Sequence, residues 1–365
     1  MPISPKILLA PLDWGIGHAT RIIPLIKYLI HNECDIVIAA DGNIRSLLQL
    51  EFPKATFITL KGYNIKYSKQ KKWLALKIAI QIPAIIFSIF YEHRWLKKVV
   101  KKYSFDAIIS DNRFGLYNFT VPCIYITHQL LVKTGNEFSE KILQKIHYWF
   151  INKYTECWVP DYAGEKNLGG QLSHPSANIP ANIHYIGRLS RFQKNIIVAI
   201  KYELLILLSG PEPQRSIFEK ILLQQLQLFD GKVLFVRGLP ASEEQLPFLQ
   251  NITIKNHLTA QELNEAIEQS KIVISRAGYT TVMDLVKLQK KGILIPTPGQ
   301  TEQEYLADYL AQNKLFVTAA QDTFNLKEAI KRAAGFNFCI VDFNMDEHKG
   351  YVDKLIKKLK NINPI

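Results

Sequence analysis

The sequence predicts an α/β protein with two doubly wound parallel sheets, each in a domain of its own. The chain has 365 residues, which at roughly 150 residues per domain is enough for two. Short apolar runs alternate with helical patterns, as in parallel sheets that are buried on both faces. The alternation begins again after a turn-rich segment at 175–191 (PSANIPANIHYIGRLSR). Hydrophobic residues make up 48% and charged residues 21% of the chain, which excludes a disordered, collagen-like or repeat protein.

The first half begins with a buried strand, a glycine turn and a helix. The strand is expected at 6–11 (KILLAP), the turn at 13–17 and the helix from about Ala19 to His31. Further buried strands, with helices between several of them, are expected at 35–40, 56–60, 106–110 and 123–127. The turn-rich segment marks the boundary, so we expect the first domain to cover 1–187.

The second half repeats this alternation. Strands are expected at 204–208, 232–236, 252–255, 271–274 and 292–296, and helices at 216–229 and 260–269. We expect a second domain at 188–345 and a C-terminal helix within 346–365 that packs back on the domains. Two such domains in tandem face each other across a cleft at the carboxyl ends of their strands, where open α/β sheets bind ligands.

The charge of the chain is concentrated in one segment. The net charge is +13 and the pI about 9.3, which predicts attraction to phosphate-bearing partners or anionic lipid. Residues 66–102 hold ten lysines and arginines but a single acid, Glu92, and so carry +9 of the total. No aromatic-rich sheet motif or recognition helix accompanies this charge, so we expect no nucleic-acid partner.

Cysteine use and the N-terminus indicate a cytoplasmic protein. The four cysteines are widely spaced and form no CxxC pair, which indicates neither a zinc cluster nor a disulfide framework. The first ten residues enter a strand pattern at once, without the charged and apolar regions of a secretion signal.

The first glycine turn carries a candidate base. Gly15 and Gly17 allow the backbone to approach a ligand, and His18 at the helix start could accept a proton from a hydroxyl. Asp111, after the strand at 106–110, is expected at the same sheet edge, where a carboxylate could hold the imidazole. The GxGH spacing lacks the third glycine of a dinucleotide fingerprint, and no acid ends the second strand, which argues against an NAD enzyme. A helix-capping histidine and a turn aspartate are the alternatives.

Three turns of the second half are expected at one sheet edge. Small and hydroxyl residues at a helix N-terminus suit a diphosphate, and an acid one turn further could bind ribose hydroxyls. Amide and carboxylate groups in the next loop suit sugar hydroxyls. Each turn alone is equally compatible with an ordinary cap. The candidates are Ser275, Arg276, Gly278, Thr280, Thr281 and Asp284, then Gln303 and Glu304, and the turn Ser209–Gly210.

Two segments resemble a known family. The run at 274–310 (ISRAGYTTVMDLVKLQKKGILIPTPGQTEQEYLADYL) is similar to the donor-binding signature of family-28, MurG-like UDP-sugar transferases, and GIGHATR at 15–21 to their acceptor-side glycine loop. The resemblance implies a GT-B fold of two Rossmann-like domains, the first binding the acceptor and the second the nucleotide sugar. The segment at 42–105 matches little of the family.

The resemblance also implies residue roles. Asp284 replaces the family's glutamate on the donor ribose, Leu258 falls where backbone groups bind uracil, and Glu304 follows Gln303 where the family usually has a second glutamine. Ser209 and Gly210 match part of a phosphate turn. His18 matches the family's base, and Asp111 the carboxylate partner of related GT-B enzymes. The acceptor side is expected to include Gly15, Gly17, Asn112, Arg113 and His128, and His128 could replace His18 as base.

The segment at 73–90 (WLALKIAIQIPAIIFSIF) is apolar enough to suggest a membrane interface. It reaches only the lower limit of a spanning helix, and Lys77 and Pro83 argue against spanning. Its basic and aromatic flanks are typical of an interfacial segment. We expect 66–102 to contact an anionic membrane peripherally, at its cytoplasmic face. The alternative is a buried helix pair with solvated lysines.

Together these observations predict an inverting, metal-independent glycosyltransferase with no cofactor. It would move a hexose or N-acetylhexosamine from a UDP-sugar to a hydroxyl of a lipid-linked or cell-envelope acceptor. A nucleotide-sugar hydrolase or epimerase of the same fold, or a non-catalytic nucleotide-sugar binding protein, are the alternatives.

Overall fold

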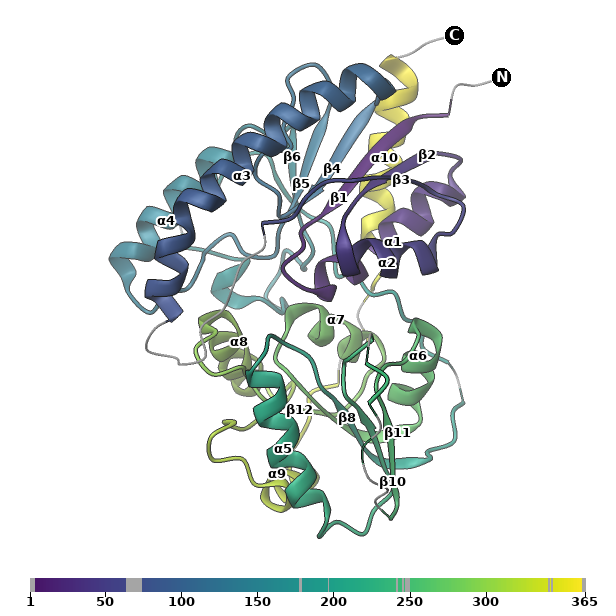
Figure 1. Ribbon diagram of the computed structural model, residues 1–365, viewed down its shortest axis with the longest axis vertical. Helices are drawn as coiled ribbons and strands as arrows, with labels where there is room; N and C mark the ends of the chain where they lie inside the picture. Colours follow the sequence, from purple (N-terminus) through teal and green to yellow (C-terminus); the bar gives the residue numbers. More distant parts are fainter. Residues whose placement is uncertain are drawn as a thin grey trace. The chain divides into compact units, whose positions relative to one another are not determined.

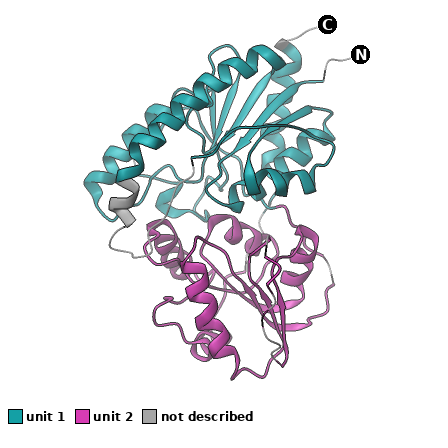
Figure 2. Ribbon diagram, in the orientation of Figure 1, with its two compact units in different colours: residues 1–66, 75–190, 344–365 teal, residues 67–74, 191–343 magenta. Residues whose placement is uncertain are grey.

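A computed structural model divides the chain into two compact units. Unit 1 comprises 1–66, 75–190 and 344–365, and unit 2 is built on 191–343 (Figure 2). The structure describes residues 4–63, 74–176, 179–195, 197–240, 242–244, 246, 250–340, 342 and 344–362, with the side chains of 74–79 and 362 excepted.

Unit 1 contains a seven-stranded parallel sheet in the order β3-β2-β1-β4-β5-β6-β7. The chain moves outward from β1 to β3 and then crosses back to β4, so its right-handed crossovers place helices on both faces. Helices α1, α2 and α10 cover one face, and α3 and α4 the other (Figure 1). The elements are β1 (Lys6–Pro11), α1 (Ile16–His31), β2 (Asp35–Ala39), α2 (Gly42–Glu51), β3 (Thr56–Ile58), α3 (Leu74–Tyr103), β4 (Ala107–Asp111), β5 (Cys123–Ile126), α4 (Glu137–Ile151), β6 (Glu156–Val159), a 3-10 helix (Gly170–Leu172), β7 (Ile183–Tyr185) and α10 (Glu347–Ile362).

The core of unit 1 explains why its strands are almost wholly apolar. Leu8, Ile108 and Tyr125 on one face of the sheet pack with Leu96 of α3 and Ile151 of α4, and all are buried. On the other face, α10 lies against α1, where the Tyr28 hydroxyl donates to Asp353 Oδ1 at 2.9 Å. The C-terminal helix thus belongs to unit 1.

Unit 2 contains a six-stranded parallel sheet in the order β10-β9-β8-β11-β12-β13. Phe218 and Leu222 of α5 pack with Leu326 and Ala329 of α9 over Ile206 on one face of this sheet. Its elements are β8 (Tyr202–Leu207), α5 (Gln214–Leu226), β9 (Val233–Val236), β10 (Ile252–Lys255), α6 (Ala260–Glu268), β11 (Ser270–Ser275), α7 (Tyr279–Lys287), β12 (Gly292–Leu294), α8 (Thr301–Gln312), β13 (Val317–Thr318) and α9 (Leu326–Ala334).

The two parallel sheets confirm the predicted fold class, with differences in detail. Helix α1 begins at Ile16 rather than near Ala19, so His18 lies in its first turn. Strand β7 lies within the segment that we expected to contain only turns. Its three residues are half-buried at the sheet edge, so they show no apolar run that could predict a strand.

Candidate functional site

Four polar side chains meet at the carboxyl edge of the unit-1 sheet. His18 and Arg21 come from the start of α1, Asp111 ends β4, and His128 follows β5. Strands β1, β4 and β5 are parallel neighbours, so their ends and the helix after β1 share this edge. The sequence predicted three of the four. It missed Arg21, although a residue three positions after His18 lies on the same face of a helix.

Arg21 is at the centre of this cluster. Its Nε donates to Asp111 Oδ2 at 2.9 Å, and its Nη2 bonds Asp111 Oδ1. Nη1 lies 2.7 Å from His128 Nδ1, and Nη2 lies 2.9 Å from His18 Nδ1. His18 Nδ1 also lies 3.3 Å from Asp111 Oδ2. The predicted pair of His18 and Asp111 is therefore in contact, but Asp111 is bound more closely by Arg21.

Burial and charge set the protonation states here. The side chains of Arg21 and Asp111 are buried, whereas His18 keeps 16% of its side-chain surface exposed. Burial and the nearby Arg21 cation lower the pKa of His18, although Asp111 opposes them. Burial raises the pKa of Asp111, but Arg21 and His18 outweigh it and hold that pKa below its usual value. His18 is thus neutral and Asp111 ionised at neutral pH, as a base and its partner must be.

Arg113, which we expected on the acceptor side, is buried in the loop after β4. Its side chain is 1% exposed, and it donates to Glu92 Oε1 at 2.7 Å and to the Pro11 carbonyl at 2.8 Å. These bonds are internal to unit 1 and give Arg113 a structural role, and its predicted place on the acceptor side stays a prediction. Asn112 beside it has a φ of 56°, and Gly15 a φ of 150°. These two, with Gly17, lie at the same sheet edge as the cluster.

Glu92 explains how the long helix α3 is held. The Tyr63 hydroxyl donates to its Oε2 at 2.7 Å, and the Gly115 amide to the same oxygen at 3.0 Å. With Arg113, these bonds fix the middle of α3 to the loops that follow β3 and β4. The single acid of the basic segment is thus buried, and the exposed charges described on α3 are all basic.

An exposed apolar surface extends over α3 and α4, which pack on the same face of the sheet. No residue from Ile80 to Tyr91 is buried, so the alternative of a buried helix pair is wrong for this part. We call the following residues the α3–α4 surface: Ile80, Ile82, Ile86, Phe87 and Phe90 on α3, and Phe138, Ile142, Leu143, Ile146 and Trp149 on α4.

Basic residues accompany this surface, and no described helix is a spanning segment. Lys97, Lys98, Lys141 and Lys145 are exposed on the same two helices. Within the described part of the chain, no helix is both long and apolar enough to cross a membrane. The basic residues predicted at 66–72 lie outside the described residues.

A second cluster lies at the carboxyl edge of the unit-2 sheet. The turn after β8 contains Gly210, with a φ of 102° that favours glycine. A Cβ atom built there would lie 3.6 Å from Thr297 Oγ1, after β12, and 3.9 Å from Arg276 Nε, after β11. Three of the predicted loops are therefore in contact at one point, with Ser209 beside Gly210.

Arg276 is a buried cation with neutral neighbours. Its Nη2 donates to Gln321 Oε1 at 2.6 Å and to the Gln214 carbonyl at 2.9 Å, and its guanidinium lies 4.7 Å from the Phe218 ring centroid. Among the described residues, its Nε and Thr297 Oγ1 are buried without a hydrogen-bond partner. Burial lowers the pKa of Arg276 to about 10. This cradle of Gly210, Arg276 and Thr297 has the chemistry of an anion site.

The other predicted donor residues lie on β11, on α7 and in the loop after β10. Ser275 ends β11, Gly278 is the N-cap of α7 without a side-chain cap, and Thr280 and Thr281 lie in the first turn of α7. Asp284 follows one turn later, is 8% exposed and engages other groups of the protein. Leu258 is half-buried between β10 and α6.

Gln303 and Glu304 support their own loop. Gln303 Oε1 accepts from the Thr297 amide at 3.0 Å, and Glu304 Oε1 accepts from the Gly299 amide at 3.0 Å. Both residues lie in the first turn of α8. Their predicted contact with a donor sugar stays a prediction, and their observed role is to shape the loop that carries Thr297.

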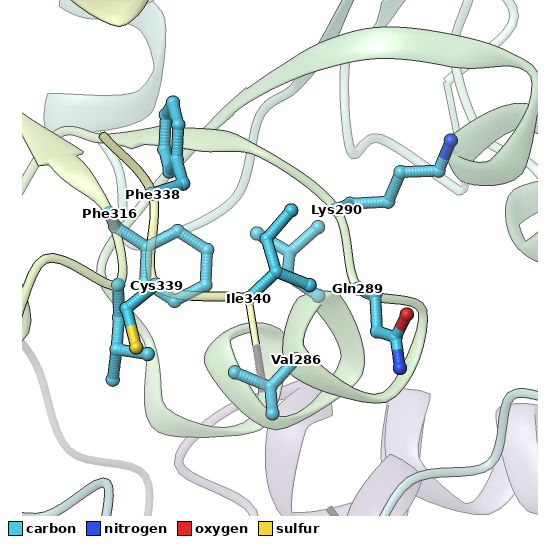
Figure 3. A pocket seen from close by; sticks show the side chains of 9 residues that line it. Val286, Gln289, Lys290, Phe316, Phe338, Cys339 and Ile340 are labelled. Carbon is cyan, nitrogen blue, oxygen red and sulfur yellow. The ribbon is translucent and has the colours of Figure 1, made fainter. Parts of the chain in front are cut away.

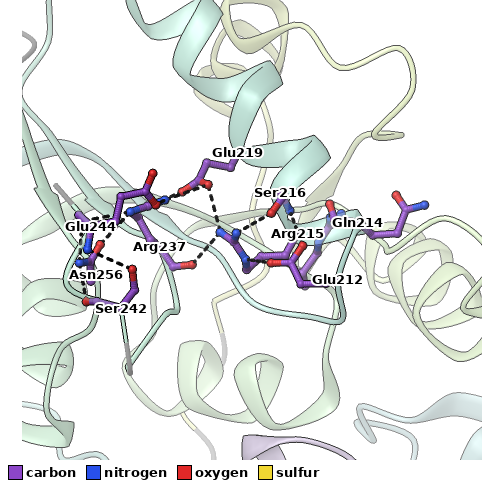
Figure 4. Close-up of polar contacts among 10 residues, drawn as sticks. Glu212, Gln214, Arg215, Ser216, Glu219, Arg237, Ser242, Glu244 and Asn256 are labelled. Carbon is purple, nitrogen blue, oxygen red and sulfur yellow. Dashed lines mark hydrogen bonds and ion pairs between the residues drawn. The ribbon is translucent and has the colours of Figure 1, made fainter. Parts of the chain in front are cut away.

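A network of ion pairs joins α5 to the loops that follow β8 and β9 (Figure 4). Glu219 of α5 accepts from Arg237 Nε at 2.6 Å and pairs with Arg215 at 3.2 Å, while Arg237 also donates to Glu244 at 2.8 Å. Glu212, directly after the Gly210 turn, binds Arg215 at 2.6 Å. Both arginines are thus paired with carboxylates, and these pairs connect α5 with the loops after Gly210 and β9.

Other features of unit 2 offer less to a ligand. A pocket beside α7, lined by Phe316, Phe338 and Ile340 among others, has room of about 20 Å³ (Figure 3), which suits a water molecule rather than a nucleotide. No group of three or more His, Cys, Asp or Glu suited to a metal ion occurs among the described residues.

Comparisons with known proteins identify the kind of domain that the chain contains. Residues 205–337 match the glycosyltransferase family 28 C-terminal domain. Two relatives are each named UDP-N-acetylglucosamine–N-acetylmuramyl-(pentapeptide) pyrophosphoryl-undecaprenol N-acetylglucosamine transferase. The Natranaerobius thermophilus protein is 27% identical over 64% of this chain and 66% of its own length. The Buchnera aphidicola protein is 24% identical over 86% of this chain and 85% of its own length.

Solved structures show the same fold at low identity. The glycotransferase of kitacinnamycin matches with a TM-score of 0.62 and 12% identity, over 99% of this chain and 95% of its own. MurG of Acinetobacter baumannii matches with a TM-score of 0.53 and 12% identity, over 98% of this chain and all of its own. The chain is therefore a glycosyltransferase of GT-B fold that carries a family 28 C-terminal domain and resembles MurG.

Proposed function

We propose that this glycosyltransferase moves a sugar from a UDP-sugar to a hydroxyl of a lipid-linked or cell-envelope acceptor, with inversion and without a metal ion. The observation that carries the proposal is the buried guanidinium of Arg276 beside the Gly210 turn. A diphosphate supplies the negative charge that this cation lacks in the described structure. The N-terminus of α7, with Gly278 as its N-cap, adds backbone N–H groups for the same charge.

The leaving group explains why such a cradle is useful. As the bond between C1 of the sugar and the diphosphate breaks, negative charge grows on the β-phosphate oxygen. Arg276 and the start of α7 would stabilise that charge more in the transition state than in the bound donor, which lowers the barrier. We therefore expect donor transfer to continue after divalent cations are removed with EDTA, and a complete loss of rate in EDTA would contradict this part of the proposal.

His18 supplies the acceptor half of the reaction. Its Nε2 takes the proton of the acceptor hydroxyl while that oxygen forms a bond to C1 on the side opposite the diphosphate, so C1 inverts and UDP leaves with the bonding electron pair. Asp111 then stabilises the imidazolium. The lowered pKa of His18 keeps the imidazole neutral, and ready to accept a proton, down to a pH below its ordinary value of about 6.5.

The α3–α4 surface supports a lipid-linked acceptor at an anionic membrane. Isolated apolar residues are common on soluble proteins, but ten exposed large apolar side chains on two helices that also carry exposed lysines fit a membrane interface. Each lysine near an anionic leaflet adds about 1 kcal/mol of attraction. The names of the two relatives, which specify an undecaprenol-linked acceptor, agree with this chemistry. We propose that the protein works in the cytoplasm, peripherally on the inner face of the membrane.

The test is a panel of UDP-, GDP- and dTDP-sugars in thermal-shift and nucleotide-release assays, with and without detergent-solubilised membrane lipid. The expected result is stabilisation by a UDP-sugar and release of UDP only when lipid acceptor is present. Release without acceptor would favour a hydrolase, and stabilisation without any release a binding protein. No response to any nucleotide would overturn the donor site.

Arg276→Gln is the matching variant. Loss of a charge-assisted bond to a phosphate costs about 1.5–3 kcal/mol, which weakens UDP binding about 10- to 150-fold. Arg332→Gln is the control, because Arg332 is an exposed cation in the last turn of α9. Equal UDP affinity in Arg276→Gln and Arg332→Gln would contradict the role of the cradle.

A further inference from the structure

Four oxygen atoms hold the guanidinium of Arg276, and none of them is charged. Nη1 donates to the carbonyls of Ile295 and Pro296, each at 3.4 Å. Nη2 donates to the Gln214 carbonyl at 2.9 Å and to Gln321 Oε1 at 2.6 Å. A guanidinium has five N–H donors, so these bonds account for four of them. The fifth is on Nε, which is buried and has no hydrogen-bond partner in the described part of the chain.

This remaining N–H group lies beside the turn after β8. A Cβ atom built on Gly210 would lie 3.9 Å from Arg276 Nε and 3.6 Å from Thr297 Oγ1. Glycine keeps that space open, and Thr297 Oγ1 is likewise buried without a hydrogen-bond partner among the described residues. One N–H group and one hydroxyl are therefore left for an anion at this turn, whereas both Nη groups of Arg276 are already engaged.

Gln321 supplies the one side chain among these four acceptors. It follows β13 and is 3% exposed. Its Nε2 donates to Gln214 Oε1 at 2.8 Å, at the start of α5. Arg276 can only donate, so the amide of Gln321 has its oxygen toward the guanidinium and its nitrogen toward Gln214. The other three acceptors are backbone carbonyls, so Gln321 is the side chain by which the sequence sets the orientation and the charge balance of Arg276.

The neutral amide differs from the partner of another buried arginine in unit 2. Arg237 donates from Nε to Glu219 at 2.6 Å, so a carboxylate balances its charge. A carboxylate at position 321 would do the same for Arg276, and a bound anion would then meet a neutral pair instead of a cation. Burial lowers the pKa of Arg276 to about 10, which still leaves the guanidinium charged at neutral pH. The amide therefore fixes the guanidinium without cancelling its charge.

We propose that Gln321 is a positioning residue for the donor phosphates: its Oε1 holds Arg276 Nη2 so that the Nε–H group stays beside the Gly210 turn, and its neutrality keeps the positive charge of Arg276 for the ligand. This inference rests on the proposed function of the cradle as the site of a diphosphate. It adds that donor affinity depends on the charge at position 321, through a residue that acts only by way of Arg276.

The first experiment compares Gln321→Glu with the native protein by calorimetric titration of UDP and of uridine. Glutamate has nearly the size of glutamine and keeps an oxygen for Arg276, but it adds a negative charge. UDP should therefore bind about tenfold more weakly or worse, since a charge-assisted bond to phosphate is lost. Uridine carries no phosphate, so its affinity should not change. A variant whose site is merely distorted would lose affinity for both ligands.

Two further variants separate charge from packing. Gln321→Met removes the acceptor but adds no charge, so it should weaken UDP binding less than Gln321→Glu does. Gln225→Glu is the matched control, because Gln225 lies at the other end of α5, where its amide donates to the Phe324 carbonyl at 2.8 Å and accepts from the Leu326 amide at 2.6 Å. It adds the same charge to the same unit, and its UDP affinity should stay within about threefold of the native value.

The native protein offers a measurement that does not depend on the folding of a Gln321 variant. The ¹H–¹⁵N signal of the Arg276 Nε–H group, identified by its absence in Arg276→Gln, should shift when UDP is added and stay in place when uridine is added. A signal that saturating UDP leaves unmoved would overturn the inference, because the N–H group left free by Gln321 would then not meet the phosphates.

The variants supply the other decisive outcomes. A folded Gln321→Glu that binds UDP within about threefold of the native protein would overturn the inference. Equal losses for UDP and uridine, a greater loss in Gln321→Met than in Gln321→Glu, or a loss of UDP affinity in Gln225→Glu as large as in Gln321→Glu would do the same. Failure of the native protein to bind UDP would refute the proposed function and this inference with it, whereas native binding without these effects would refute the inference alone.

Discussion

Removing two phenylalanines from the α3–α4 surface should release the protein from anionic vesicles. Phe87 is 72% exposed and Phe90 62% exposed. Full burial of such a side chain is worth about 1.5–3 kcal/mol, so the exposed fractions leave about 1–2 kcal/mol each to be gained in a membrane. Phe87→Ser/Phe90→Ser should therefore lose about 2–4 kcal/mol of binding, or about 30- to 1000-fold in partitioning.

The assay is co-sedimentation with vesicles that contain phosphatidylglycerol, compared with vesicles of phosphatidylcholine alone. Native protein should bind the anionic vesicles more strongly, and high salt should weaken the difference because it screens the lysines. Leu228→Ser is the control, since Leu228 is 90% exposed but lies in unit 2 after α5. Because the substituted side chains are exposed, stability should change by less than about 0.5 kcal/mol.

The reasoning is refuted if the folded double variant binds within threefold of the native protein. It is also refuted if Leu228→Ser loses as much binding as the phenylalanine pair, because contact would then not be specific to α3 and α4. Binding that is equal for anionic and neutral vesicles would contradict the role given to the exposed lysines of α3 and α4.

Three further outcomes follow from buried groups. Burial lowers the pKa of His147 to about 4, so the unfolded chain binds more protons than the folded one between about pH 6.5 and 4. The free energy of unfolding should therefore fall by about 3 kcal/mol as the pH is lowered over that range. Urea titrations should find this pH dependence weakened in His147→Gln. Glu92→Ala leaves Arg113 buried without its carboxylate and should lower the free energy of unfolding by about 3–5 kcal/mol. The double variant Glu92→Ala/Arg113→Met should lose less stability than the two single variants together. Additive losses would show that the pair is not coupled. Gly238→Ala should lower the melting temperature, because its Cβ would lie 2.3 Å from the Leu208 carbonyl at a φ of 72°; an unchanged transition would contradict this.

The sequence predicted the fold best where burial alone determines which residues a segment contains. Apolar runs such as KILLAP specify buried parallel strands, and parallel strands bring the residues after them to one edge, which is why His18 and Asp111 were predicted together. Strand β7 escaped prediction because an edge strand of three half-buried residues lacks such a run. The ion pair of Arg113 escaped prediction for another reason: its partner Glu92 lies 21 residues earlier on another element, and only the fold brings the two together.

The buried arginines of the two units differ in whether a carboxylate balances their charge. Arg21, Arg113 and Arg237 each face a carboxylate, so their charges are balanced within the fold. Arg276 is equally buried, yet its described partners are neutral, and burial lowers its pKa to about 10. A buried cation without a carboxylate partner costs free energy, and an anion bound beside it would offset that cost, which is why we propose a phosphate site there. Sequence alone cannot make this distinction, because all four arginines follow or flank predicted strands and helices in the same way. Only the presence or absence of an acid across the fold separates the three arginines whose charge is balanced internally from Arg276.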